Sequence, residues 1–142
     1  MAQAETTIRR VLGEYRTWAV VGCSPDRRRD SHDVAAFLLS HGYEVIPVNP
    51  GCTEILGRLC YPTVADIPGP VEVVDIFRRS ESAGAHVDEA VAAGARAVWM
   101  QLGVIDEAAA ERASAAGLDV VMDRCPKIEL PRLVRSGLRP PA

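Results

Sequence analysis

The sequence has 142 residues, of which 48% are hydrophobic, and a formal net charge of −3. This size and composition predict one globular domain with a core of its own and no second domain for separate chemistry. The slightly acidic balance gives no electrostatic footprint for DNA or RNA. Neither a membrane span nor a signal peptide is recognisable, so we expect a cytoplasmic protein.

The first elements alternate between helix and strand. Apolar residues spaced three and four apart predict a short amphipathic helix over 7–15, which we expect to pack on the sheet as a lid or edge brace. A wholly apolar strand follows at 18–21 and stops at Gly22. Beyond a polar loop, Asp30 or Ser31 is expected to cap a helix that Gly42 closes.

The middle of the chain is less regular. Residues 43–48 predict a second strand that ends in turn residues, and the two strands with their helix have the length of a βαβ unit. Residues 53–59 are too few for a crossover helix. We expect a brief edge strand within 57–62 and one helical turn over 63–68.

Regular alternation returns in the second half. Strands are expected at 71–77, 96–103 and 118–122, and a helix over about 81–93 separates the first two. Asp106 is expected to cap a helix that runs to Gly117. Pro126 suits the first position of a final helix, whose length Pro131 leaves open.

This order predicts an α/β fold: a doubly wound, mostly parallel, Rossmann-like sheet of about five to six strands, with helices on both faces. We divide the chain into an N-terminal helix packed on the domain (1–17), the domain itself (18–136) and a flexible tail (137–142). Ligands of such folds bind in a crevice at the carboxyl ends of the strands.

Each strand end offers residues to that crevice. The first offers Gly22, Cys23 and Ser24 before a helix start, where unpaired N–H groups and the helix dipole favour phosphate. Packing alone also explains one glycine at a strand end, and the G-x-G-x-x-G fingerprint is incomplete. The other strand ends offer Val48, Asn49 and Pro50; Phe77, Arg78 and Arg79; Gln101 and Gly103; and Asp123, Arg124 and Cys125.

A dinucleotide site would place an acidic residue at the end of the second strand, to hold the ribose hydroxyls. Asn49 stands there instead, and Glu44 begins the strand at the opposite edge of the sheet. The residues therefore disfavour NAD, which is kept as an alternative.

Arginines make the mouth of the crevice more basic than the chain as a whole. Guanidinium groups suit phosphate oxygens, although the loop run Arg27 to Arg29 is also explained by simple solvation. Arg78 directly follows a buried-looking strand at the edge where ligands bind, so we assign it a functional role.

Five segments in this order resemble the small stand-alone CoA-binding domain proteins of bacteria and archaea. They are Val20 to Pro25, Gly42 to Pro50, Val74 to Arg79, Trp99 to Gly103 and Asp123 to Lys127, within a match from about Trp18 to Leu133. The resemblance implies a Rossmann-type fold related to the CoA-binding domain of the succinyl-CoA synthetase α subunit. It also implies coenzyme A, or an acyl-CoA, as the small-molecule nucleotide ligand.

The resemblance also implies a placement of the ligand. The CoA phosphates and ADP would lie near Gly22, Cys23, Ser24, the loop with Arg27, Ser31 and His32. The adenine or ribose would lie beside Val48, Asn49 and Pro50. The pantetheine arm would pass Phe77, Arg78 and Gln101.

The chain departs from the synthetase pattern, because its first loop has one glycine and no second domain supplies a phosphorylated histidine. Ligase activity is therefore not inherited with the fold. Because no Ser-His-Asp or Cys-His order stands out, we rank a non-catalytic CoA-binding module first. A dinucleotide-dependent enzyme comes second and a protein-interaction domain third. A protein partner or homo-oligomer stays open.

The cysteines Cys23, Cys52, Cys60 and Cys125 form no C-x-x-C pair, which argues against a zinc site and a disulfide framework. Cys23 and Cys125 follow strand ends, where a helix start could stabilise a thiolate and allow a mixed disulfide with CoA. The alternative, which we favour, is that both are small buried hydrophobic residues.

Overall fold

The structure is a computed structural model that describes residues 5–141. Residues 1–4 of the expected N-terminal segment and Ala142 of the expected tail lie outside the described residues. The elements in chain order are α1 (Glu5–Glu14), β1 (Thr17–Val21), α2 (Asp30–Ser40), β2 (Glu44–Val48), β3 (Glu54–Ile55), β4 (Arg58–Leu59), a 3₁₀ turn η1 (Val64–Asp66), β5 (Val73–Ile76), α3 (Ser80–Ala92), β6 (Ala97–Met100), α4 (Glu107–Ala115), β7 (Asp119–Val121) and α5 (Pro126–Arg135).

Five parallel strands form the main sheet in the order β2-β1-β5-β6-β7. The chain first moves outward from β1 to β2 and then returns to the other side of β1, so the winding reverses between β1 and β5. The predicted doubly wound α/β fold is confirmed. Folds of this class bind ligands in a crevice at the carboxyl ends of the strands where the winding reverses, which here are β1 and β5.

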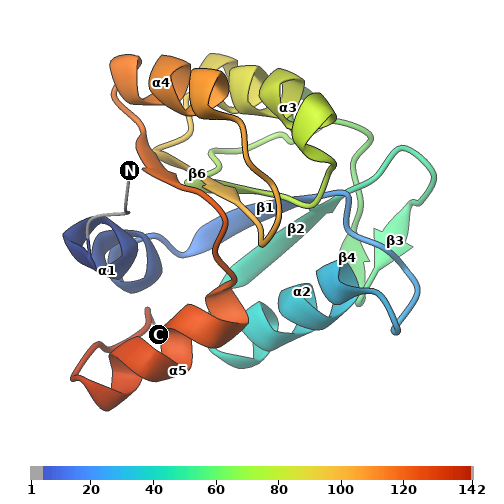
Figure 1. The fold of residues 1–142 in the computed structure, drawn as a ribbon. Helices are drawn as coiled ribbons and strands as arrows, with labels where there is room; N and C mark the ends of the chain where they lie inside the picture. The colour runs from blue at the N-terminus through green and yellow to red at the C-terminus, as the bar shows by residue number, and fades with distance from the viewer. Residues whose placement is uncertain (1–4, 142) are drawn as a thin grey trace.

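Helices cover both faces of the sheet (Figure 1). α3 and α4 pack against each other on one face, while α1, α2 and α5 form the other layer. Two buried clusters correspond to these faces, and the one under α1, α2 and α5 contains both Trp18 and Trp99 with ring centroids 5.5 Å apart. Apart from Asp75, the central strands β5 and β6 carry only apolar side chains, because helices bury both faces of the sheet.

The sequence explains why α1 and α5 share a layer. Ile8, Val11 and Leu12 form the buried stripe of α1, and Leu130 and Leu133 form that of α5. Leu138, in the expected tail, packs against the same cluster. A membrane-crossing helix would need a longer apolar stretch than any helix within residues 5–141 provides.

The predicted cap of α2 is wrong. The helix begins at Asp30, so Arg29 occupies the N-cap position and makes no side-chain capping bond. Ser31 lies inside the first turn, where its hydroxyl accepts a hydrogen bond from the Ser24 N–H at 3.0 Å. The serine therefore ties the first loop to the helix. By contrast, the predicted cap of α4 is confirmed, since the Asp106 carboxylate accepts from the Ala109 N–H at 3.0 Å.

The brief strand expected within 57–62 does not extend the main sheet as a sixth strand. β4 pairs antiparallel with β3 in a separate hairpin, and only Tyr61 bridges to Val48 at the end of β2. The predicted single helical turn is present as η1. Pro131 lies inside α5 without ending it, which settles the length that the sequence left open.

Candidate ligand site at the carboxyl edge of the sheet

A pocket of about 830 Å³ opens at the carboxyl ends of β5 and β6, between the starts of α2 and α5. We call it the carboxyl-edge pocket. Its lining residues are Arg28, Arg29, Asp30, Ser31, Asp33, Val34, Phe77, Arg78, Arg79, Gln101, Leu102, Gly103, Val104, Cys125, Lys127 and Ile128. The pocket lies next to the point where the winding reverses, and doubly wound sheets bind their ligands at this point.

Three helices begin at this pocket. α2 starts at Asp30, α3 follows Arg79, and α5 follows Cys125, and all three of these residues line the pocket. A helix start carries unpaired backbone N–H groups and the positive end of the helix dipole. The arrangement therefore favours a ligand with negative charge.

Gly22 lets the ends of β1 and β5 approach closely. It has φ +80°, and a Cβ at this position would stand 2.3 Å from the carbonyl oxygen of Phe77 and 3.4 Å from Nε of Arg78. The Arg78 side chain therefore lies over the Gly22 backbone. Only glycine fits here, because both the positive φ and the short approach exclude a side chain.

The loop between β1 and α2 is held by its own polar groups. The Ser24 hydroxyl accepts from the Asp26 N–H at 3.0 Å, and Asp26 in turn accepts from the Arg28 guanidinium at 3.1 Å. Together with the bond from Ser24 to Ser31, these contacts give the loop a defined shape beside the pocket. Ser24 and Ser31 therefore already act as structural residues.

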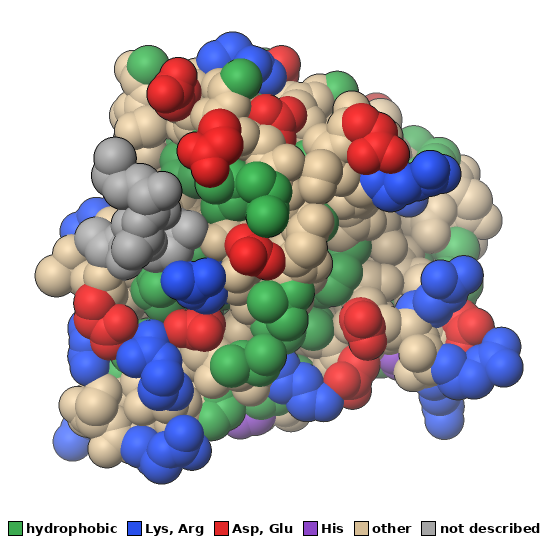
Figure 2. Space-filling view, in the orientation of Figure 1, with side chains coloured by type: hydrophobic (Ala, Val, Ile, Leu, Met, Phe, Trp, Pro, Cys, Tyr) green, Lys and Arg blue, Asp and Glu red, His purple; other side chains and the backbone are tan. Residues whose placement is uncertain are grey.

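Cationic side chains outnumber carboxylates in the pocket. Five Arg or Lys residues and two Asp residues line it, although the whole chain carries a net charge of −3. Lys127 of α5 pairs with Asp33 of α2 at 2.5 Å, which joins the two helices beside the pocket. Figure 2 shows Lys and Arg side chains crowded at the right-hand side, where the loop before α2 lies in Figure 1.

Arg78 is the cation best placed for a ligand. Its guanidinium makes no hydrogen bond or ion pair with any residue in the described part of the chain, and the side chain is half-buried. Arg79 is exposed and lies 3.8 Å from Glu81. A half-buried guanidinium without a protein partner is free to bind an anion, with less screening than an exposed one.

Apolar side chains form the rest of the wall. Leu102 and Ile128 are 52% and 56% exposed, and they come from the loop after β6 and from α5. Phe77 and Val104 also line the pocket. In Figure 2, hydrophobic side chains run down the middle of this face, and Asp or Glu side chains lie between them and the Lys and Arg side chains at the right. The pocket therefore combines an anion-binding part with an apolar part, as sites for organic phosphates do.

Two buried polar side chains lie at or below the pocket floor. Gln101 lines the pocket and is only 6% exposed, while Asp75 of β5 has no exposed surface. Burial raises the pKa of Asp75 well above the usual range of an aspartate. The carboxyl therefore carries its proton over a wider pH range than an exposed Asp does.

The thiolate hypothesis for Cys23 conflicts with its surroundings. Cys23 has no exposed surface, and burial, followed by the neighbouring Cys60, Asp75 and Cys52, raises its pKa to about 12. The thiol is therefore protonated at neutral pH, in agreement with the packing alternative. Cys125 is 7% exposed and lines the pocket.

The pocket brings together seven of the residues that the sequence offered to the crevice, namely Ser31, Phe77, Arg78, Arg79, Gln101, Gly103 and Cys125. The lining does not include Gly22, Cys23, Ser24, Arg27, His32, Val48, Asn49 or Pro50. Asn49 uses both ends of its amide inside the protein, since Nδ2 donates to the Cys23 carbonyl at 2.9 Å and Oδ1 accepts from the Gly51 N–H at 2.8 Å. It shapes the strand end next to the pocket.

The sequence missed the contribution of α5. Lys127 and Ile128 line the pocket because α5 returns alongside α2, which chain order alone does not reveal. A signal was present in the turn before Pro126, at the carboxyl end of a predicted strand. Such an end faces the same crevice as the other strand ends.

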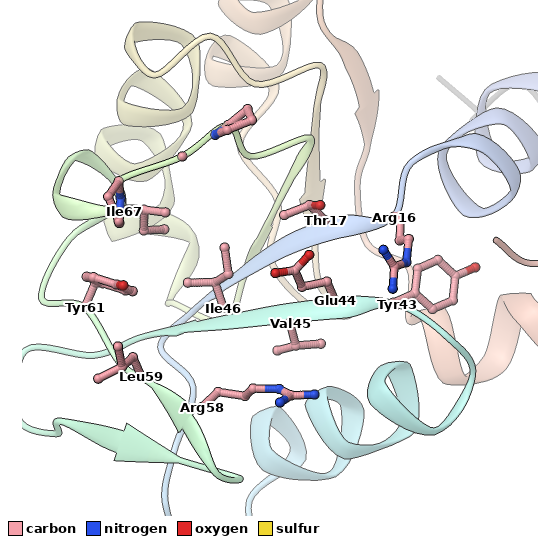
Figure 3. A pocket seen from close by; sticks show the side chains of 13 residues that line it. Arg16, Thr17, Tyr43, Glu44, Val45, Ile46, Arg58, Leu59, Tyr61 and Ile67 are labelled. Atoms are coloured by element: carbon pink, nitrogen blue, oxygen red, sulfur yellow. The ribbon is translucent and has the colours of Figure 1, made fainter. Parts of the chain in front are cut away.

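A second hollow of about 720 Å³ lies along the outer edge of β2, and we call it the β2-edge groove. Figure 3 shows Arg16 and Glu44 near one end and Tyr61 and Ile67 at the other, with Arg58 reaching below the strand. Glu44 thus lies at the opposite edge from the strand ends, as predicted. The residues that line the groove do not include the first residues of α2, α3 or α5. The groove therefore lacks the anion-binding geometry of the carboxyl-edge pocket.

Within residues 5–141, no group of three or more His, Cys, Asp or Glu side chains is arranged to hold a metal ion. The carboxyl-edge pocket offers cationic side chains, backbone N–H groups at helix starts and apolar contacts.

The fold is Rossmann-like, with a pocket at the carboxyl edge of its sheet, and sequence comparison assigns the family. The CoA binding domain family matches residues 16–131, so the chain belongs to this family. The resemblance found in the sequence is confirmed.

Relatives of similar length match most of this chain. "Uncharacterized protein YneT" of Bacillus subtilis (strain 168) is 35% identical over 125 residues, which span 88% of this chain and 93% of that protein. The solved structure of a hypothetical protein from Pyrococcus horikoshii OT3 is 42% identical with a TM-score of 0.89, covering 94% of each chain.

A larger enzyme contains a similar domain. The dinucleotide forming acetyl-coenzyme A synthetase 1 of Ca. Korarchaeum cryptofilum, solved in complex with phosphate and ADP, is 27% identical with a TM-score of 0.70. The match covers 82% of this chain but 27% of the synthetase chain. The similarity therefore concerns one part of that enzyme.

Proposed function

We propose that the protein binds coenzyme A or an acyl-CoA in the carboxyl-edge pocket and that it has no catalytic activity of its own. The observation that carries the proposal is the unpartnered, half-buried Arg78 at the meeting point of three helix starts. Membership of the CoA binding domain family supports the choice of ligand.

The chemistry of the pocket matches the parts of coenzyme A. Arg78, Arg79, Lys127 and the helix starts suit its phosphates, since charge-assisted hydrogen bonds from guanidinium and backbone N–H groups bind phosphate well. The apolar wall with Leu102 and Ile128 suits the less polar arm. The similar synthetase was solved with phosphate and ADP, two ligands whose groups also occur in coenzyme A.

The dinucleotide alternative has weaker support. The residue at the end of β2 that would hold a ribose is Asn49, and both ends of its amide are bonded within the protein. No carboxylate replaces it there. Coenzyme A is therefore expected to bind more tightly than NAD or NADP.

Titration calorimetry with CoA, acetyl-CoA, NAD and NADP tests this order. We expect measurable binding of CoA or acetyl-CoA and at least tenfold weaker binding of both dinucleotides. Mass spectrometry of the natively purified protein provides a second readout, because a tightly bound ligand would copurify with it. Equal affinity for NAD would overturn the choice of ligand, and binding of none of the four would favour an interaction domain.

A further inference from the structure

Three side-chain oxygens are buried without a hydrogen-bond partner in the described part of the chain. They are Oδ1 and Oδ2 of Asp75 and Oε1 of Gln101. Native proteins pair almost all of their buried polar atoms, so each such atom calls for an explanation. All three oxygens belong to only two side chains.

The two side chains lie on the same face of neighbouring strands. Asp75 of β5 is in register with Trp99 of β6, and Gln101 follows Trp99 by two residues. Side chains two apart on a strand share a face, so Gln101, the residue after the end of β6, continues the face that carries Asp75 and Trp99. Gln101 lines the carboxyl-edge pocket, whereas Asp75 does not and is fully buried. Asp75 therefore lies behind the residues that line the pocket.

The Asp75 carboxyl is suited to be a hydrogen-bond donor. Burial raises its pKa well above the usual range, and a protonated carboxyl has one O–H to donate. The nearby Cys23 thiol has a pKa of about 12, raised mainly by burial, so it adds no charge at neutral pH. The remaining unpartnered acceptor on this face is Oε1 of Gln101.

We propose that Asp75 is a positioning residue whose carboxylic acid O–H donates to Oε1 of Gln101 and turns Nε2 toward the pocket. Nε2 then offers its N–H groups to an acceptor oxygen of the ligand, such as a carbonyl or phosphate oxygen. The ligand part of this inference rests on the proposed function. The hydrogen bond between Asp75 and Gln101 is a property of the free protein.

The free protein gives the first test, by NMR. Carbon-13 titration of the wild type should find the Asp75 carboxyl protonated at pH 7, and an ionised carboxyl would overturn the proposal. The Gln101 side-chain amide should be rigid in the wild type and in Asp75→Asn, which keeps a donor, with a nitrogen-15 order parameter of about 0.85. In Asp75→Leu, which has nearly the same shape and no donor, it should fall below about 0.6.

A control separates positioning from a general loss of packing. Val73→Ala lies on the same strand and face but further from the pocket, so it should lower stability and leave the Gln101 amide rigid. Equal rigidity of this amide in the wild type and Asp75→Leu would contradict the proposal. So would equal loss of rigidity in Asp75→Leu and Val73→Ala.

Binding of coenzyme A gives the second test, by calorimetry. Asp75→Leu should weaken CoA binding about three- to tenfold, as expected for one hydrogen bond, and Asp75→Asn should stay within twofold. In a Gln101→Leu background the effect of Asp75→Leu should vanish, because Asp75 acts through Gln101. Additive effects would overturn the proposal. If CoA binds neither the wild type nor any variant, the proposed function is wrong. The NMR results on the free protein then still decide whether Asp75 positions Gln101.

Discussion

At the scale of single residues, Arg78 carries the expected anion contact. Charged hydrogen bonds contribute about 1.5–3 kcal/mol, so Arg78→Ala should weaken CoA binding roughly 10- to 150-fold without unfolding the domain. Calorimetry with CoA measures the change. Arg58→Ala, in the β2-edge groove, is the matched control and should bind like the wild type. A change within twofold for Arg78→Ala would remove this residue from the site.

Gly22 is expected to be indispensable for the shape of the carboxyl edge. Gly22→Ala combines a positive φ with a contact of 2.3 Å to the Phe77 carbonyl, and it should lower the free energy of unfolding by at least about 2 kcal/mol. Gly94→Ala is the control, because Gly94 has φ +75° with nothing within 4 Å. Its cost should be about 1 kcal/mol. Urea denaturation measures both, and equal costs would show that the close approach is unimportant.

Asp75 should make stability depend on pH. Its pKa is raised in the folded protein, so the folded state keeps a proton that the unfolded state loses above about pH 4. Stability therefore falls as pH rises from there to the folded pKa, by up to about 1.4 kcal/mol per pH unit. Asp75→Asn removes this dependence. The free energy of unfolding of this variant should therefore rise relative to that of the wild type from pH 4 upward. Parallel stability curves from pH 4 to 8 would contradict this.

At the scale of elements, α1 is fastened to the β7 edge by polar contacts. The Arg10 guanidinium donates two hydrogen bonds of 2.9 Å to Asp119, the first residue of β7, and the Tyr15 hydroxyl donates a third at 3.1 Å. These contacts join the N-terminal helix, expected as a lid or edge brace, to the edge strand β7. The bonds from Arg10 and Tyr15 hold the pKa of Asp119 below its usual range, although partial burial opposes them.

Asp119→Asn should loosen this brace. We expect a loss of about 1 kcal/mol at pH 7, which is below the usual range for charged hydrogen bonds because the pair is partly exposed. Because the folded pKa is lowered, the contribution is present above the ordinary aspartate range and disappears as pH falls through the folded value. Thermal unfolding at pH 7 and pH 3 should show the difference shrinking in acid. A constant difference would assign the effect to packing.

At the scale of the whole molecule, local patterns determined most of the fold. Apolar runs that end in Gly22 or Asn49, and caps such as Asp106, predicted the alternation and therefore the sheet. The hairpin of β3 and β4 was not predicted as a separate sheet, because strands of two residues carry no periodic signal.

The site was predictable only where strand ends define it. Phe77, Arg78 and Gln101 follow apolar strands, so the parallel topology brings them to one edge. Lys127 and Ile128 enter through the packing of α5 beside α2, which depends on contacts between distant segments. Asp75 is the one charged residue of β5, and its lack of a partner becomes evident only when the neighbouring elements are in place.

The central claim is that coenzyme A binds in the carboxyl-edge pocket, and backbone NMR during a CoA titration tests it most directly. We expect the largest shift changes in the four segments that contribute the lining residues, at 28–34, 77–79, 101–104 and 125–128. Residues 43–46 and 58–61 of the β2-edge groove should stay unchanged. Changes centred on that groove, or no saturable changes at millimolar CoA, would contradict the account.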